Sequence, residues 1–185
     1  MILFINACVR KDSRTLRLAK AFLEKQEDDI REELLSDIDF PIADEAFLQR
    51  RDSLIENKEW NDPLFKYARH FAEADRIVIA APYWDLSFPA SLKQYFEQIN
   101  VMGITFEYSP EGIPVPLCRA TELIYITTAG GAYVPEEYGF GYVKALAQGF
   151  YGIENIRQIK ACGLDIYGAD IDGIMSGAID GILNT

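Results

Sequence analysis

The sequence predicts an α/β fold in which a parallel sheet of five strands is covered by helices on both faces. Three observations lead to this prediction. Short apolar runs of strand length recur five times along the chain. Segments with apolar residues at helical spacing stand between these runs, so that strands and helices alternate. The run at 77–81 is apolar at every position, which is typical of a parallel strand buried on both faces.

Length, charge and cysteine usage narrow the function classes. With 185 residues, the chain fits a single domain over 1–185. Its net charge of −11 disfavours nucleic acids and anionic membrane surfaces as partners. The first apolar run is too short for a signal peptide or a membrane span, so we expect a cytoplasmic protein. Cys8, Cys118 and Cys162 are widely spaced, which predicts reduced thiols and no metal site.

The first predicted strand spans 2–8, and an amphipathic helix follows it. The joining segment at 10–15 has the sequence Arg-Lys-Asp-Ser-Arg-Thr. Cations, hydroxyls and the free N–H groups of a helix terminus together suit a phosphate group. The segment is not a Walker loop, and on local grounds a helix cap by Asp12 or Ser13 explains it slightly better.

The next part of the chain is less regular. A second, more exposed strand is expected at 31–42, and residues 43–57 suggest a helix or a mobile excursion. Pro63 then opens an amphipathic helix. This helix carries the single histidine, His70, which lies well before the next strand. We therefore expect His70 to be solvated or packed rather than catalytic.

The strand at 77–81 ends at Pro82, which has no N–H to donate to a ladder, and a helix begins near Pro89. The loop between them is rich in large apolar side chains, namely Tyr83, Trp84, Leu86 and Phe88. At the carboxyl end of a parallel strand such a loop can face a flat ligand. Equally, these side chains can simply cover the edge of the sheet.

The remaining elements are expected in the following order: a flap or short hairpin at 103–117, a strand at 122–128, a helix at 143–151, a strand at 156–162 and a helix at 171–182. The run Ala-Gly-Gly-Ala-Tyr at 129–133 follows the fourth strand. Its glycines either let the backbone approach a ligand or form a simple turn. Its place at a strand end favours the ligand.

Three loops, after the first, third and fourth strands, are thus expected at one edge of the sheet. They offer phosphate donors, an aromatic platform and a glycine backbone, which together suit FMN better than a dinucleotide. The run Gly-Phe-Gly at 139–141 does not directly follow a strand and lacks the third glycine of a dinucleotide fingerprint. No nucleophile elbow of an α/β-hydrolase is present in the sequence.

These segments resemble the flavodoxin-like, FMN-dependent NAD(P)H:quinone oxidoreductases and azoreductases. The run Ala-Pro-Tyr-Trp-Asp-Leu at 81–86 is similar to the Ala-Pro-Met-Tyr/Trp-Asn-Phe segment of that family, and 103–108 and 127–131 match as well. The resemblance implies a three-layer α/β/α fold with strand order 2-1-3-4-5. It also implies an FMN site made of Cys8, Arg10, Ser13, Arg14, Thr15, Pro82, Tyr83, Trp84, Asp85, Leu86, Thr128, Ala129, Gly130, Gly131 and Tyr133.

Two residues depart from the family pattern. Asp85 stands where the family usually has asparagine, and Ala129 replaces a frequent arginine. A charged Asp85 would disfavour the anionic reduced flavin. Because both departures leave the backbone contacts in place, FMN binding is still expected.

The function implied is two-electron transfer from NADH or NADPH, through FMN, to a quinone, an azo compound or a similar aromatic acceptor. No side chain is expected to act as an acid or base, because the cofactor carries the chemistry. The resemblance also implies a homodimer in which the partner covers the flavin, consistent with the aromatic loops and the flap at 103–117. The alternative is a flavodoxin-like electron carrier that serves a protein partner. Two observations argue against this alternative: the flap, and the closer match of the motifs to the reductases.

Overall fold

The computed structural model describes residues 1–183, and the last two residues of the predicted domain lie outside this range. Five parallel strands form the central sheet in the order β2-β1-β3-β6-β7, which is the predicted order 2-1-3-4-5 when these five strands alone are counted. Their bounds are β1 Ile2–Asn6, β2 Ile30–Leu34, β3 Arg76–Ala80, β6 Glu122–Thr128 and β7 Asn155–Ala161. The expected fold is confirmed.

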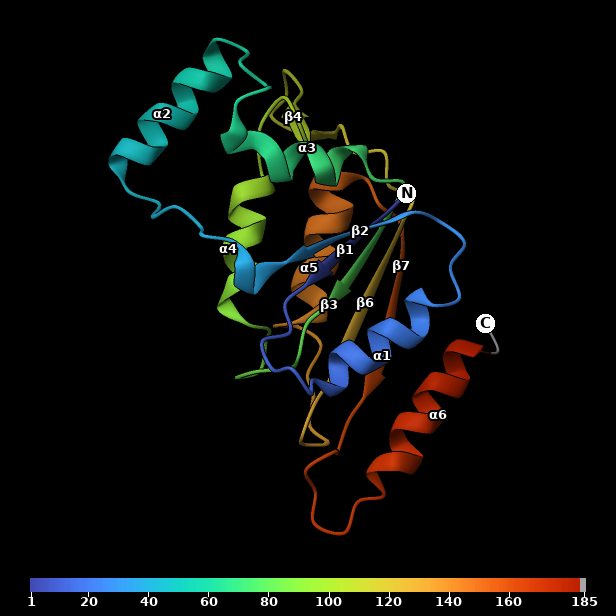
Figure 1. Ribbon diagram of the computed structural model, residues 1–185. Helices are drawn as coiled ribbons and strands as arrows, with labels where there is room; N and C mark the ends of the chain where they lie inside the picture. Colours follow the sequence, from blue (N-terminus) through green and yellow to red (C-terminus); the bar gives the residue numbers. More distant parts are fainter. Residues whose placement is uncertain (184–185) are drawn as a thin grey trace.

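Helices cover both faces of the sheet, so the molecule has three layers (Figure 1). One face carries α1 Arg14–Leu23 and α6 Ile171–Leu183. The other carries α3 Lys66–Glu73, α4 Ala90–Ile99 and α5 Phe140–Leu146. In the central strands, successive side chains point to opposite faces. Leu3 and Ile5 therefore belong to the core under α3, α4 and α5, whereas Ile2 and Phe4 belong to the core under α1 and α6.

Several boundaries differ from the sequence prediction. The second strand ends at Leu34; the rest of the predicted strand is a 3-10 turn at Leu35–Asp37 followed by an irregular segment at 38–42. The segment at 43–57 forms α2 Glu45–Glu56, of which Leu54 is the buried residue. Figure 1 shows α2 standing away from the sheet, which explains its mixed polarity. The helix predicted at 143–151 begins at Phe140 as α5 and continues as a π-helical turn at Ala147–Tyr151.

The predicted hairpin is present as β4 Phe106–Tyr108 paired with β5 Pro114–Pro116. The segment that follows the hairpin lies at the end of the sheet where the strands begin. There the N–H of Arg119 donates to the carbonyl of Ala72, just before β3. Figure 1 shows β4 at the end of the sheet away from the strand tips. The hairpin therefore lies away from the carboxyl edge of its own sheet.

His70 has a packing role in α3. Its Nδ1 lies 2.7 Å from Oε1 of Glu33, a buried residue of the edge strand β2. The pair joins β2 to α3 on the face away from α1. Within residues 1–183, no helix is both long and apolar enough to cross a membrane.

Candidate functional site

The carboxyl ends of four strands bring four loops together at one edge of the sheet. The backbone ties these loops to one another just beyond the strands. The N–H of Ala7, after β1, donates to the carbonyl of Ala80 at the end of β3. The N–H of Ala129, after β6, donates to the carbonyl of Ala161 at the end of β7. The loops are thereby held in register with the sheet that carries them.

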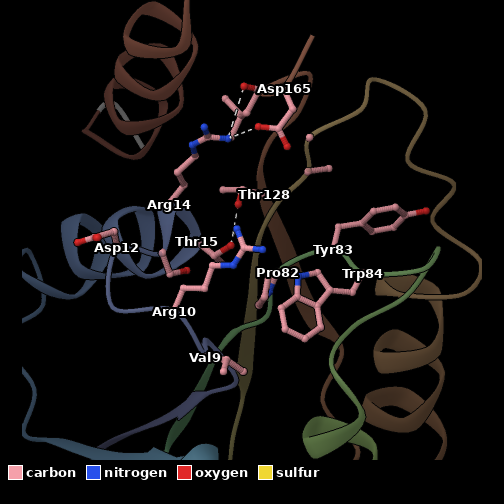
Figure 2. Close-up of a pocket in the computed structure, with 14 residues that line it drawn as sticks. Val9, Arg10, Asp12, Arg14, Thr15, Pro82, Tyr83, Trp84, Thr128 and Asp165 are labelled. Atoms are coloured by element: carbon pink, nitrogen blue, oxygen red, sulfur yellow. Dashed lines mark hydrogen bonds and ion pairs between the residues drawn. The ribbon is translucent and has the colours of Figure 1, made fainter.

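A cleft of about 320 Å³ lies between these loops (Figure 2). Ten of the residues predicted from the sequence line it: Arg10, Ser13, Arg14, Thr15, Pro82, Tyr83, Trp84, Thr128, Ala129 and Gly130. The first, third and fourth loops thus meet in space as expected.

The basic end of the cleft is built around the start of α1. Ser13 is the N-cap of this helix, and its Oγ accepts a hydrogen bond from the N–H of Leu16 at 3.2 Å. The hydroxyl proton of Ser13 remains available to a ligand. Arg10 is exposed, and Figure 2 shows its guanidinium group between Thr15 and Pro82. The first turn of α1 contains no acidic side chain, so an anion meets the positive end of the helix there.

Arg14 reaches the opposite wall of the cleft. Its Nη1 lies 2.8 Å from Oδ1 of Asp165, in the loop after β7, and 3.4 Å from the carbonyl oxygen of Leu164. The same loop packs closely on the glycine pair after β6, because the N–H of Asp165 donates to the carbonyl of Gly130 at 2.9 Å. A Cβ added to Gly130 would lie 2.2 Å from Oδ2 of Asp165, so any larger residue there would have to displace this carboxylate.

A tight turn forms the aromatic wall. Trp84 and Ser87 exchange two backbone hydrogen bonds, and the two residues between them, Asp85 and Leu86, have φ angles of +49° and +69°. Left-handed conformations at residues other than glycine cost free energy and cluster at functional sites. The Oγ of Ser87 donates to the carbonyl of Tyr138 at 2.6 Å, which links the turn to the loop after β6. The indole of Trp84 is 40% exposed beside the cleft.

The structure shows which backbone N–H groups are available to donate a hydrogen bond to a bound ring. The N–H of Tyr83 already donates to Thr128, and that of Trp84 donates to Ser87. In the described part of the chain, the N–H groups at 85–86 and 130–131 have no hydrogen-bond partner. The turn and the glycine pair therefore each leave two backbone donors free for a ligand.

Five predicted residues lie outside the cleft lining: Cys8, Asp85, Leu86, Gly131 and Tyr133. Cys8 is 5% exposed, and its thiol donates a long hydrogen bond of 3.8 Å to Ala80. Burial raises the pKa of Cys8 to about 11. The thiol of Cys8 is thus a buried support beneath the loop and remains protonated at neutral pH.

Four lining residues were not predicted as site residues: Val9, Asp12, Leu164 and Asp165. Asp12 belongs to the predicted phosphate segment at 10–15, where it is predicted only as a helix cap. Leu164 and Asp165 belong to the loop after the fifth sheet strand. The rule that placed the other loops at the carboxyl edge applies to this loop as well. Its sequence, Cys-Gly-Leu-Asp at 162–165, carries no motif of its own.

Comparisons with known proteins agree with this geometry. Residues 1–184 match a family described as having a flavodoxin-like fold. An FMN-dependent NADH:quinone oxidoreductase of Clostridium beijerinckii is 37% identical over 188 residues, which cover 97% of this chain and 94% of that protein. The chain belongs to the FMN-dependent NADH:quinone oxidoreductase family. The resemblance drawn from 81–86, 103–108 and 127–131 is confirmed. The present chain is therefore an oxidoreductase.

Solved structures of other proteins have the same fold as the present chain. The azoreductase of Bacillus anthracis str. Sterne superposes with a TM-score of 0.85 at 24% identity, covering 99% of this chain and 96% of that one. An FMN-dependent NADH-azoreductase of Bacillus anthracis str. Ames Ancestor, solved in complex with FMN, superposes with a TM-score of 0.79 at 24% identity, covering 99% and 95%. Both azoreductases thus share one architecture with this chain.

Proposed function

We propose that the chain binds FMN in the cleft and transfers two electrons from NADH to a quinone, an azo compound or a similar aromatic acceptor. The donor would reduce the flavin and leave before the acceptor enters the same space. One observation supports this proposal most directly: a cationic helix start and an exposed indole face the same cleft from opposite sides. The names of the relatives supply the cofactor, the donor and the two acceptor classes.

The groups that line the cleft fit FMN. Arg10, the hydroxyl of Ser13 and the start of α1 would hold the phosphate group. The ring would lie between Trp84 and the glycine pair. Two carboxylates line the phosphate end, Asp12 and Asp165. The charge of Asp165 is offset by Arg14 at 2.8 Å, and Figure 2 shows the carboxylate of Asp12 pointing away from the other lining side chains.

FMN bound in the cleft would supply the redox chemistry that links the donor to the acceptor. The residues of the chain position it. The free N–H groups at 85–86 and 130–131 are suited to hydrogen-bond the polar edge of the ring, and donors fixed in place stabilise charge that develops there. The exposed face of Trp84 offers a flat apolar surface for donor and acceptor rings.

We also propose that the active form is a homodimer whose partner covers the cleft. Large apolar side chains from all four loops are exposed around it: Val9, Trp84, Leu86, Tyr133, Tyr138, Ile166 and Tyr167. An exposed apolar rim of this kind commonly marks an interface. Sedimentation of the FMN-loaded protein tests the proposal. A monomer at micromolar concentration would contradict it.

The hairpin of β4 and β5 no longer argues against the alternative of an electron carrier, because it lies at the other edge of the sheet. An anaerobic titration of the FMN-loaded protein with NADH, followed by quinone, separates the two functions. Rapid two-electron bleaching of the flavin band, reversed by quinone, is the result expected of the oxidoreductase. Flavin that stays oxidised with NADH would favour the carrier, and failure to bind FMN would refute both.

A further inference from the structure

A second depression runs along α1, next to the cleft. It has a volume of about 610 Å³ and lies between α1 and Ile179 of α6. Figure 1 shows these two helices side by side on the same face of the sheet. Asp12, Ser13 and Arg14 line both the cleft and this depression, so the two adjoin at the start of α1.

The depression is cationic in an otherwise acidic protein. Residues 10–20 contain five of the 18 Lys and Arg and one of the 29 Asp and Glu, a net charge of +4 in a chain whose total is −11. Four of these cations line it: Lys11, Arg14, Arg17 and Lys20. We call it the cationic groove. Its two carboxylates, Asp12 and Glu24, stand at the start and end of α1.

Three of the four cations are free to bind an anion. Lys11, Arg17 and Lys20 are exposed, and none of them forms an ion pair with any residue of the described range. Arg14 is the exception, through Asp165. On the helix, residues three apart share a face, so Arg14, Arg17 and Lys20 form one row.

The floor of the groove is apolar, because Leu16, Ala21 and Ile179 line it between the charged side chains. An apolar floor under a row of cations suits a base and ribose joined to phosphates. The ten residues of α1 span about 15 Å at 1.5 Å per residue. FMN has a single phosphate, which the start of α1 can hold, so most of this row lies beyond the needs of that cofactor.

We propose that the cationic groove binds the adenosine diphosphate part of the NADH donor. This inference rests on the proposed function, since the nicotinamide must reach the flavin in the adjoining cleft. The row formed by Arg17 and Lys20 faces the two phosphates. Glu24 at the far end would repel the additional 2′-phosphate of NADPH, so the groove favours NADH.

The test is a double variant that removes two cations outside the FMN cleft, Arg17→Gln with Lys20→Gln. A matched control, Lys58→Gln with Lys144→Gln, removes two exposed cations that line neither the cleft nor the groove. Dihydronicotinamide riboside, which lacks the adenosine diphosphate, serves as the control donor. We expect the groove variant to raise KM for NADH about tenfold, the scale of local electrostatic attraction. KM for the riboside and the affinity for FMN should stay unchanged.

Three outcomes would overturn the proposal. An unchanged KM for NADH would make the groove an ordinary solvated helix face. A rise in KM shared by the riboside would indicate a general effect on the flavin. Weaker FMN binding in the groove variant would show that these cations bind the cofactor rather than the donor.

Calorimetry with ADP-ribose on the FMN-loaded protein separates this inference from the proposed function, because it needs no turnover. Binding by the wild type that is weakened about tenfold in the groove variant, but not in the matched control, supports the groove even if NADH fails to reduce the flavin. No binding by the wild type, or equal binding by the groove variant, refutes the groove even if NADH is oxidised.

Discussion

The hydroxyl oxygens of Thr15 and Thr128 lie 2.7 Å apart in the protein interior, and they join the first turn of α1 to the end of β6. The two residues are separated by 113 positions in the sequence, and each is less than 9% exposed. A hydrogen bond between buried hydroxyls fixes the phosphate end of the cleft to the glycine end. The shape of the site therefore depends on this pair as well as on the groups that would touch the ligand.

Replacing either threonine alone by valine should lower the free energy of unfolding by about 1–3 kcal/mol, because a buried hydroxyl is left without a partner. The double variant Thr15→Val with Thr128→Val should lose less than the sum of the single losses, since it leaves no unpaired hydroxyl. Urea denaturation measures all three proteins. Strictly additive losses would show that the two hydroxyls do not interact.

Ser13→Asp separates helix capping from phosphate binding. Aspartate is a good N-cap, so the free energy of unfolding should change by less than about 1 kcal/mol. Its negative charge opposes a phosphate at the start of α1, so FMN affinity should fall by at least tenfold. Fluorescence titration with FMN measures the affinity. Unchanged affinity would mean that Ser13 is a cap alone, the explanation that local sequence slightly favours.

Gly130→Ala should weaken FMN binding about tenfold, because the new Cβ displaces Asp165 from Arg14 and the carboxylate, no longer offset, then repels the phosphate. The adjacent variant Gly131→Ala is the matched control, since a Cβ there meets no atom within 4 Å. Dissociation constants for FMN should therefore differ between the two variants. Equal effects would show that the close approach of Asp165 does not matter for the site.

Asp85→Asn should raise the midpoint potential of bound FMN, because it removes a negative charge that opposes reduced flavin. Asparagine tolerates the left-handed conformation of position 85, so the turn should be retained. Asp52→Asn, on the exposed α2, controls for total charge. Redox titration against a reference dye gives the potentials. The same potential in both variants would place Asp85 too far from the ring to act.

The stability of the protein should fall above pH 9 in part because of Cys8. Burial raises the pKa of this thiol from 9.0 to about 11, so between these values the unfolded chain loses a proton that the folded chain keeps. The free energy of unfolding therefore decreases with pH in this window. Cys8→Ala should show a shallower decrease in denaturation series at pH 8, 9 and 10. Parallel curves would exclude the contribution of Cys8.

Much of the fold follows from local sequence. Runs such as 77–81 are apolar at every position, and Pro82 and Pro89 mark where a strand stops and a helix starts. These signals depend on residues within a few positions of one another. The second strand was predicted too long because its residues are mostly exposed, so their pattern hardly distinguishes a strand from the turn that follows Leu34.

The sequence by itself determined the order of strands and helices along the chain, and with it which loops stand at the carboxyl edge, because apolar periodicity and the effects of proline and glycine are local properties. Tertiary structure alone decided how those loops meet. In the folded structure Thr15 contacts Thr128, and Asp165 contacts Arg14 across 151 positions of the sequence. The hairpin lies at the edge of the sheet opposite the cleft. Such contacts form only when the sheet has assembled, because they depend on packing between segments that are far apart in the sequence. The local sequence of one segment does not indicate which other segment it will contact.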